Sequence, residues 1–156
     1  MANYNSKFEV IRPSLDSLIR AALPVTDAGL LNPLGTSPVP LLPGEFVEDA
    51  AGGKYARADN TASTKLAYAV IEDQGDYGVQ ASGKLSALRG GTYEADTYLF
   101  AAGLTTLGAP VEVGVVAVDG NNHSGLIANT TGLVIGYVTK VAADNGGRLR
   151  FLQTLV

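Results

Sequence analysis

The sequence predicts a mainly β protein: a small antiparallel β-barrel or sandwich over residues 44–156, preceded by an extended, proline-rich N-terminal arm, residues 1–43, that carries one short helix. The chain of 156 residues has the size of one domain, and its 19 glycines and low charged content of 17% favour short strands and many turns. Six of the seven prolines lie before Gly44, which marks a change in composition at that residue.

The arm begins with a segment of helical periodicity. Its apolar residues recur at helical spacing, and Ser14 stands where its side chain can cap the first turn. Pro24 cannot continue a helix. The pattern therefore predicts a two-turn helix from about residue 15 to residue 23.

The rest of the arm is unusually apolar for an extended segment. Between residues 21 and 44 the only charged side chain is that of Asp27, so this stretch resembles neither a solvated linker nor a disordered tail. We expect it to lie against a surface, which is either its own body or another subunit. The candidate partner-binding residues are Leu23, Leu30, Leu31, Leu34, Val39, Leu41 and Leu42.

The body contains short apolar or alternating segments separated by Gly, Asn and Asp residues. Turn chemistry at Asp119-Gly120 and again at residues 144–147 predicts two chain reversals, the second of them a hairpin. In the last strand Arg148 and Arg150 should share a solvated face, opposite Leu149 and Phe151. The strands are expected at residues 65–72, 77–88, 97–102, 111–118, 133–142 and 148–156.

Several functional classes are disfavoured. The chain has no cysteine, and its formal net charge of −4 is spread along the sequence without a basic cluster, so we expect no nucleic-acid partner. It lacks an apolar run long enough to cross a membrane and a recognisable signal peptide, so we expect neither a membrane partner nor classical secretion. No glycine motif predicts a nucleotide site.

Catalytic and metal-binding residues are also not expected. The single histidine, His123, is predicted to be an exposed turn residue without a catalytic role, because its surroundings have a loop composition. The acidic residues are interpreted as solvated strand ends and turns, so that no metal, no cofactor and no enzymatic activity are predicted. These acidic groups are Glu45/Glu48/Asp49, Glu72/Asp73/Asp76 and Glu94/Asp96.

Two strings carry a family resemblance: LLPGEFVE at residues 41–48 and GLVIGYVTKVAADNGGRLRFLQTLV at residues 132–156. Together with the apolar arm and the β body, they resemble the decoration, or cement, proteins of tailed-bacteriophage capsids. The resemblance implies a homotrimer on the outer capsid surface of a virion, with the major capsid protein as partner, made in the host cytoplasm without a signal peptide. The alternative is a receptor- or glycan-binding β-module of a phage head fibre or tail.

Overall fold

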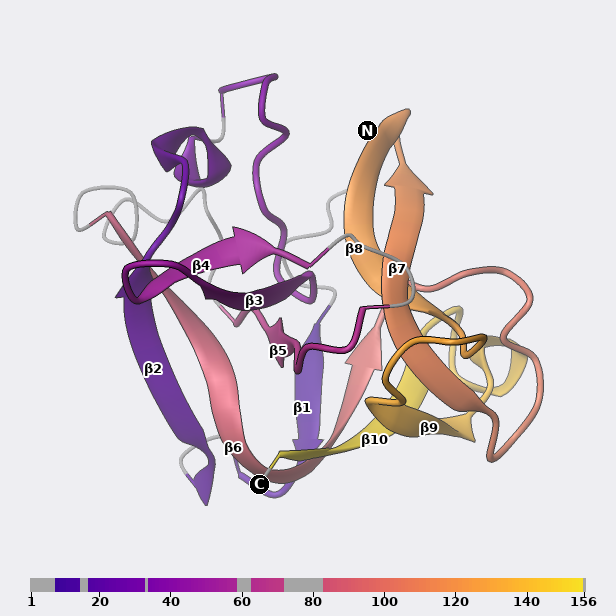
Figure 1. Cartoon of the computed structure of the whole chain (residues 1–156). Coiled ribbons are helices and arrows are strands. Elements are labelled where there is room, and N and C mark those ends of the chain that lie inside the picture. Colours follow the sequence, from indigo (N-terminus) through magenta and orange to yellow (C-terminus); the bar gives the residue numbers. More distant parts are fainter. Residues whose placement is uncertain (1–7, 15–16, 33, 59–62, 72–82, 156) are drawn as a thin grey trace.

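The computed structural model describes residues 8–14, 17–32, 34–58, 63–71 and 83–155, and these residues form two antiparallel sheets (Figure 1). The mainly β, sandwich-like fold is therefore confirmed, without a closed barrel among the described strands. The smaller sheet has the order β4-β3-β5, formed by Lys54–Arg57, Phe46–Ala50 and Tyr68–Ala69.

The larger sheet has seven strands. Its main path runs β1-β6-β10-β9-β7-β8, and β2 also pairs with β6. In chain order these strands are β1 (Glu9–Arg12), β2 (Ile19–Pro24), β6 (Lys84–Thr97), β7 (Pro110–Val118), β8 (Asn121–Ala128), β9 (Gly136–Lys140) and β10 (Leu149–Leu155).

Strand β6 is long because two glycines let it bend. Its first half pairs with β2, and its second half pairs with β1 on one side and β10 on the other. Gly91, at the change of partner, has φ +101°, and a Cβ there would lie 2.7 Å from the Leu18 side chain. A Cβ at Gly90 would meet Ile19 at 2.8 Å. The glycine pair thus gives the start of β2 room to cross β6.

The helix predicted at residues 15–23 is wrong in its described part. Residues 19–24 form β2, which pairs in antiparallel register with β6, from Ile19 opposite Gly90 to Pro24 opposite Lys84. Pairing with a distant strand has overridden a weak local periodicity. The arm does carry a short helix, but it is the 3-10 helix η2 at Ala28–Leu31, whose first turn Asp27 caps by accepting a hydrogen bond from the Gly29 N–H at 2.9 Å.

Both predicted reversals are present. The expected strand at 111–118 lies within β7, and the turn to β8 uses Asp119 and Gly120 at φ 50° and 81°. Strand β9 pairs with β10 after the 3-10 helix η3 (Ala142–Asp144). In β10, Leu149 and Phe151 are fully buried, whereas Arg150 is partly exposed on the other face, as expected.

Other strand boundaries differ from the predictions. The segment 97–102 is not a strand beyond Thr97, and Phe100 makes only an isolated bridge to Leu126. In the segment 65–72, which is predicted to be one strand, only Tyr68–Ala69 forms a strand. Residue 72 lies outside the described residues, and so do residues 77–82 of the next predicted strand. Strand β6 continues past residue 88, because the glycine pair bends it rather than ending it.

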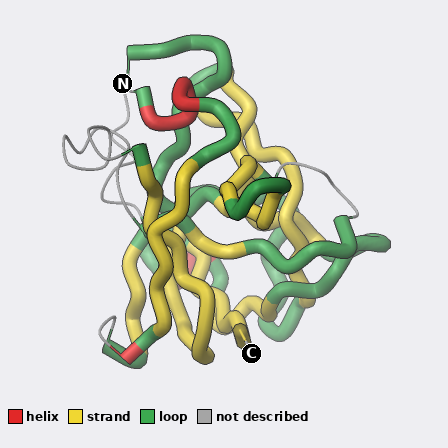
Figure 2. Tube along the Cα trace, turned by 60° about the vertical axis from the view of Figure 1, so that its left-hand side comes forward, coloured by secondary structure: helices red, strands yellow, loops and turns green. Residues whose placement is uncertain are grey.

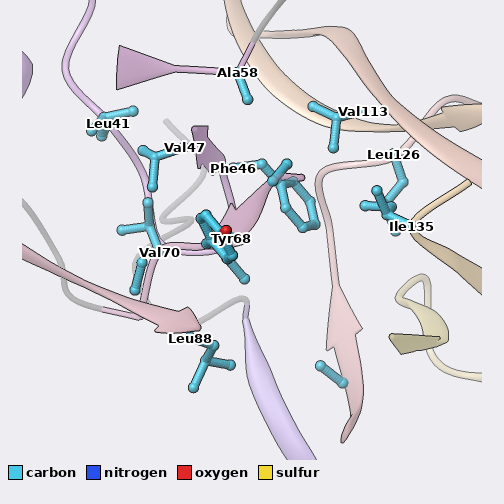
Figure 3. Close-up of a cluster of buried hydrophobic side chains, with 14 of the residues drawn as sticks. Leu41, Phe46, Val47, Ala58, Tyr68, Val70, Leu88, Val113, Leu126 and Ile135 are labelled. Carbon is cyan, nitrogen blue, oxygen red and sulfur yellow. The ribbon is translucent and has the colours of Figure 1, made fainter. Parts of the chain in front are cut away.

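The hydrophobic core fills the space between the two sheets (Figure 3). Phe46 of β3 and Phe151 of β10 meet edge to face, with 6.3 Å between ring centroids. The same buried cluster includes Leu30, Leu31 and Leu41, which precede the compositional boundary at Gly44. That boundary is therefore not an edge of the core, and the division into arm and body stays a prediction. None of the helices in the described segments has the length and apolar character that crossing a bilayer requires.

Candidate functional site

The candidate site is the loop that projects from one end of the molecule, which we call the apolar loop and define as residues 26–42 (Figures 1 and 2). It contains η2 and no charged residue after Asp27. Its two limbs are joined by a backbone hydrogen bond of 2.9 Å from the Leu41 N–H to the Leu30 carbonyl. This bond holds the described residues at the base of the apolar loop together.

The seven predicted partner-binding residues have three different environments. Leu30, Leu31 and Leu41 are buried in the chain's own core, with exposed fractions of 4%, 3% and 0%. Leu23, Val39 and Leu42 are partly buried. Leu34 is 91% exposed, the most exposed large apolar side chain in the described part of the chain. Of the seven, Leu34 is the residue most available to another molecule.

Leu34 is held by the turn that precedes it. The side-chain Oδ1 of Asn32 accepts a hydrogen bond from the Leu34 N–H at 3.1 Å, and the Asn32 carbonyl accepts one from the Gly35 N–H at 3.0 Å. The neighbouring Leu31 is buried and fixes the base of the turn. These two bonds restrain the backbone at Leu34 and Gly35, which lowers the entropy lost on binding.

A buried polar cluster lies where the apolar loop joins the body. The fully buried carboxylate of Glu45 accepts hydrogen bonds from Arg57 Nε at 2.8 Å and from the backbone N–H groups of Leu42 at 2.6 Å and Ser124 at 2.9 Å. Its Oε2 also lies 2.9 Å from His123 Nδ1. We call Glu45, Arg57, His123 and Ser124 the Glu45 cluster. Its hydrogen bonds compensate the cost of burying the charges.

The prediction that His123 is an exposed turn residue is wrong. His123 lies on β8 and is only 4% exposed. The turn consists of Asp119 and Gly120 alone, so the polar residues that follow it already belong to the strand. The partner of the imidazole, Glu45, is 78 residues away, and no local pattern in a single sequence indicates that pairing.

The Glu45 cluster is arranged for structure rather than for nucleophilic catalysis. In a catalytic triad the imidazole lies between the carboxylate and the nucleophile. Here Ser124 Oγ contacts the main chain of Phe46, accepting from its N–H at 2.8 Å and lying 2.9 Å from its carbonyl oxygen. Among the described residues its side-chain partner is Glu45, at 3.3 Å, and not the imidazole. The cluster therefore joins β8 of the larger sheet to β3 of the smaller one.

The cluster also fixes the C-terminal end of the apolar loop. Arg57 donates from Nη2 to the Val39 carbonyl at 2.6 Å, while Glu45 holds the Leu42 N–H. Both loop positions are therefore attached to the same buried ion pair. The conformation that presents Leu34 depends on contacts with both sheets.

The remaining acidic groups that the structure describes are mostly paired. Arg89 binds both carboxylate oxygens of Asp49, and these bonds hold the pKa of Asp49 below its usual value. The guanidinium of Arg89 also lies 4.1 Å from the ring centroid of Tyr68. Glu48 is 3.6 Å from the Lys65 ammonium. Residues 72–76, which include the second acidic group, lie outside the described residues.

Asp96 is the second carboxylate with a shifted pKa. Burial acts to raise this pKa, but hydrogen bonds from Arg150 and Asn145 and the charge of Arg148 outweigh burial and hold it below the usual value. The Arg150 Nε lies 2.8 Å from Asp96 Oδ1. Within the described ranges, no three acidic or histidine side chains are placed to hold a metal ion together.

Comparison of the chain with protein-family models, with curated proteins and with solved structures gives no match.

Proposed function

We propose that the protein is a non-enzymatic virion structural protein that binds the outer surface of a tailed-phage capsid as an oligomer and stabilises the shell. The observation that carries the proposal is Leu34, 91% exposed on the apolar loop, which has no charged residue after Asp27. A leucine in this setting is suited to fill a pocket of a partner, because binding removes its apolar surface from water and orders little else.

The resemblance to decoration proteins supports this proposal through residues with structural roles. In the string PGEFV, residues 43–47 are all buried, and Gly44 has φ +88°. A Cβ at Gly44 would lie 3.0 Å from Phe8. The string thus forms the junction between the apolar loop and the body, as expected when proteins share an architecture rather than a catalytic site.

The Glu45 cluster is the nearest approach to a catalytic set in the described part of the chain. Its carboxylate, imidazole and hydroxyl all make contacts that hold β3, β8 and the apolar loop together. This use of the polar side chains favours a role in assembly over a role in chemistry.

The proposed partners are further copies of the chain, in a homotrimer, and the major capsid protein. Identical copies on a symmetric lattice multiply modest contacts through effective concentration. One exposed leucine per subunit can therefore contribute to tight binding of an oligomer at the virion surface.

The proposal is tested by measuring how the purified protein binds to capsid shells that lack it. Such shells are purified from host cells infected with a virus from which the gene for this chain has been deleted. We expect the parent to bind and to raise the temperature at which the shells break. Leu34→Asp should lose most of this binding, because an unpaired carboxylate is costly in an apolar contact. The matched control is Leu107→Asp, a leucine 64% exposed outside the apolar loop, which should bind like the parent.

Two outcomes would overturn the proposal. The first is that the parent neither binds such shells nor changes their stability. The second is that Leu34→Asp binds as well as the parent, which would remove the observation on which the proposal depends.

A further inference from the structure

A second surface with functional features is the outer face of the larger sheet. Residues opposite one another in antiparallel strands project on the same side of a sheet. The strand registers align a row across five strands whose side chains share one face: Arg12 on β1, Glu94 on β6, Leu152 on β10, Tyr137 on β9 and Pro110 on β7.

The opposite face of the same strands belongs to the core. Tyr93, Phe151 and Val138, which alternate with the residues of the row, are 1%, 0% and 2% exposed. Tyr137, in contrast, is 51% exposed. The row therefore faces solvent, with an aromatic ring and a leucine side chain next to each other at its centre.

The face also carries charged residues, and one of its cations forms no ion pair in the described part of the chain. Three carboxylates of this face interact with arginine: Asp96 with Arg150 at 2.8 Å, Glu94 with Arg12 at 2.7 Å, and Glu9 with Arg148 at 3.2 Å. The fourth cation, Lys140, lies opposite Arg150 in register and makes no ion pair in the described part of the chain. Lys140 is thus a cation on this face without a carboxylate partner in the described part of a chain whose net charge is −4.

A shallow hollow adjoins the exposed tyrosine. It has a volume of about 400 Å³ and is lined by Arg12, Pro13, Thr92, Tyr93, Glu94 and Leu152. Beside it the hydroxyl of Thr139 donates to Glu94 Oε2 at 2.9 Å. The hollow combines an apolar floor with hydroxyl, carboxylate and guanidinium groups at its rim.

At 400 Å³ the hollow falls within the range of small-ligand sites, so it can hold one or two sugar rings.

We propose that this face binds an acidic oligosaccharide, a carbohydrate chain whose sugars carry carboxylates. The ring of Tyr137 can stack on the apolar C–H face of a sugar, and the rim of the hollow can exchange hydrogen bonds with its hydroxyl groups. Lys140 supplies the charge that a carboxylate on the next sugar requires. The inference goes beyond the proposed capsid-binding role and uses none of the residues of the apolar loop.

Other occupants fit the face less well. A nucleic acid needs several unpaired cations along its backbone, whereas the arginines of this face already bind carboxylates. A membrane surface needs a wider apolar area than Leu152 and Tyr137 provide. A carboxylated sugar requires only the combination that is present: one exposed ring, hydroxyl-binding groups and a nearby cation.

The test is titration calorimetry with defined probes on the full-length chain. The acidic probes are hexamers of mannuronate, galacturonate and hyaluronan, the neutral probe is cellohexaose, and the polyanion probe is oligothymidylate. We expect at least one acidic hexamer to bind roughly tenfold more tightly than cellohexaose, a difference typical of one charge-assisted contact.

Two variants locate the site. Tyr137→Ala should weaken binding of the acidic hexamer roughly tenfold through loss of stacking, and Tyr137→Phe should restore it. Lys140→Ala should reduce binding of the acidic hexamer to the level of cellohexaose. The matched control, Lys54→Ala on β4, should bind like the parent. All variants should keep the thermal unfolding midpoint and the shell binding of the parent, so failure here is distinct from failure of the proposed function.

The proposal is overturned if none of the acidic hexamers binds, if cellohexaose binds as tightly as they do, or if either site variant binds like the parent. Tighter binding of oligothymidylate than of every hexamer would also overturn it, and would identify the face as a polyanion surface.

Discussion

Glu45 and His123 are 78 residues apart in sequence, yet the carboxylate Oε2 of one lies 2.9 Å from the imidazole Nδ1 of the other, and both side chains are buried. Glu45 immediately precedes β3 and His123 lies on β8, so this contact links the two sheets. Arg57, on β4, supplies the positive charge that pairs with the Glu45 carboxylate.

The first prediction concerns this buried charge. Glu45→Gln should lower the free energy of unfolding by about 3–5 kcal/mol, because it leaves the nearly buried guanidinium of Arg57 without its counter-charge. Denaturant titration followed by circular dichroism measures the change. The control is Glu48→Gln, which removes a looser pair with the exposed Lys65 and should cost less than about 1 kcal/mol. Equal effects of the two substitutions would contradict the assigned role of Glu45.

The second prediction concerns pH. The pKa of Asp96 is held below its ordinary value of 3.8, chiefly by Arg150 and Asn145 against the opposing effect of burial. A carboxylate with a depressed pKa in the folded state stabilises the protein above its unfolded pKa, and this contribution is lost as the pH falls through the folded value. The free energy of unfolding should therefore fall as the pH drops below about 4. Asp96→Asn should flatten this dependence, and an unchanged acid profile in that variant would refute the assignment.

The third prediction concerns the bend in β6. Gly91→Ala places a Cβ at a backbone with φ +101° and 2.7 Å from Leu18. Gly52→Ala meets a similar backbone constraint, φ +79°, with no atom within 4 Å of the new Cβ. We expect Gly52→Ala to cost about 1–2 kcal/mol and Gly91→Ala to cost about 1–3 kcal/mol more through the added clash. Thermal unfolding of both variants gives the comparison, and equal losses would show that Leu18 moves aside freely.

The fourth prediction concerns the boundary at Gly44. Strands β1 and β2 precede it and both pair with β6, and Leu30, Leu31 and Leu41 belong to the common core. We therefore expect a chain of residues 44–156 to lose cooperative unfolding, because β6 lacks two partners and the core lacks three leucines. The change in composition predicts the opposite result, a soluble body that folds alone. A sharp thermal transition of the shortened chain would support the boundary.

Features encoded locally could be predicted from the sequence. The Asp119-Gly120 turn and the alternation of Arg148, Leu149, Arg150 and Phe151 depend on neighbouring residues, and the structure contains both. The helix expected before Pro24 fails because β6, more than sixty residues later, pairs with that segment. The bend at Gly91 could not be predicted from the sequence either, because a glycine pair is equally typical of the end of a strand.

The candidate site was predictable in part for the same reason. The near absence of charge predicts that the apolar loop lies against a surface, but burial against distant strands decides that Leu30 and Leu31 are core residues while Leu34 is exposed. The Glu45 cluster could not be predicted, because it brings together four side chains from β8, β4 and the residue before β3.

The attachment of the apolar loop to the Glu45 cluster has a mechanical consequence. A force applied at Leu34 is transmitted along the chain to Val39 and Leu42. The Val39 carbonyl is bound by Arg57, and the Leu42 N–H is bound by Glu45. Because Glu45 also binds Ser124 on β8, the load is shared by both sheets and does not peel away one edge strand. Detaching the loop by force therefore requires several hydrogen bonds to the Glu45 cluster to break together, so a shell held through Leu34 would be tethered to the whole fold.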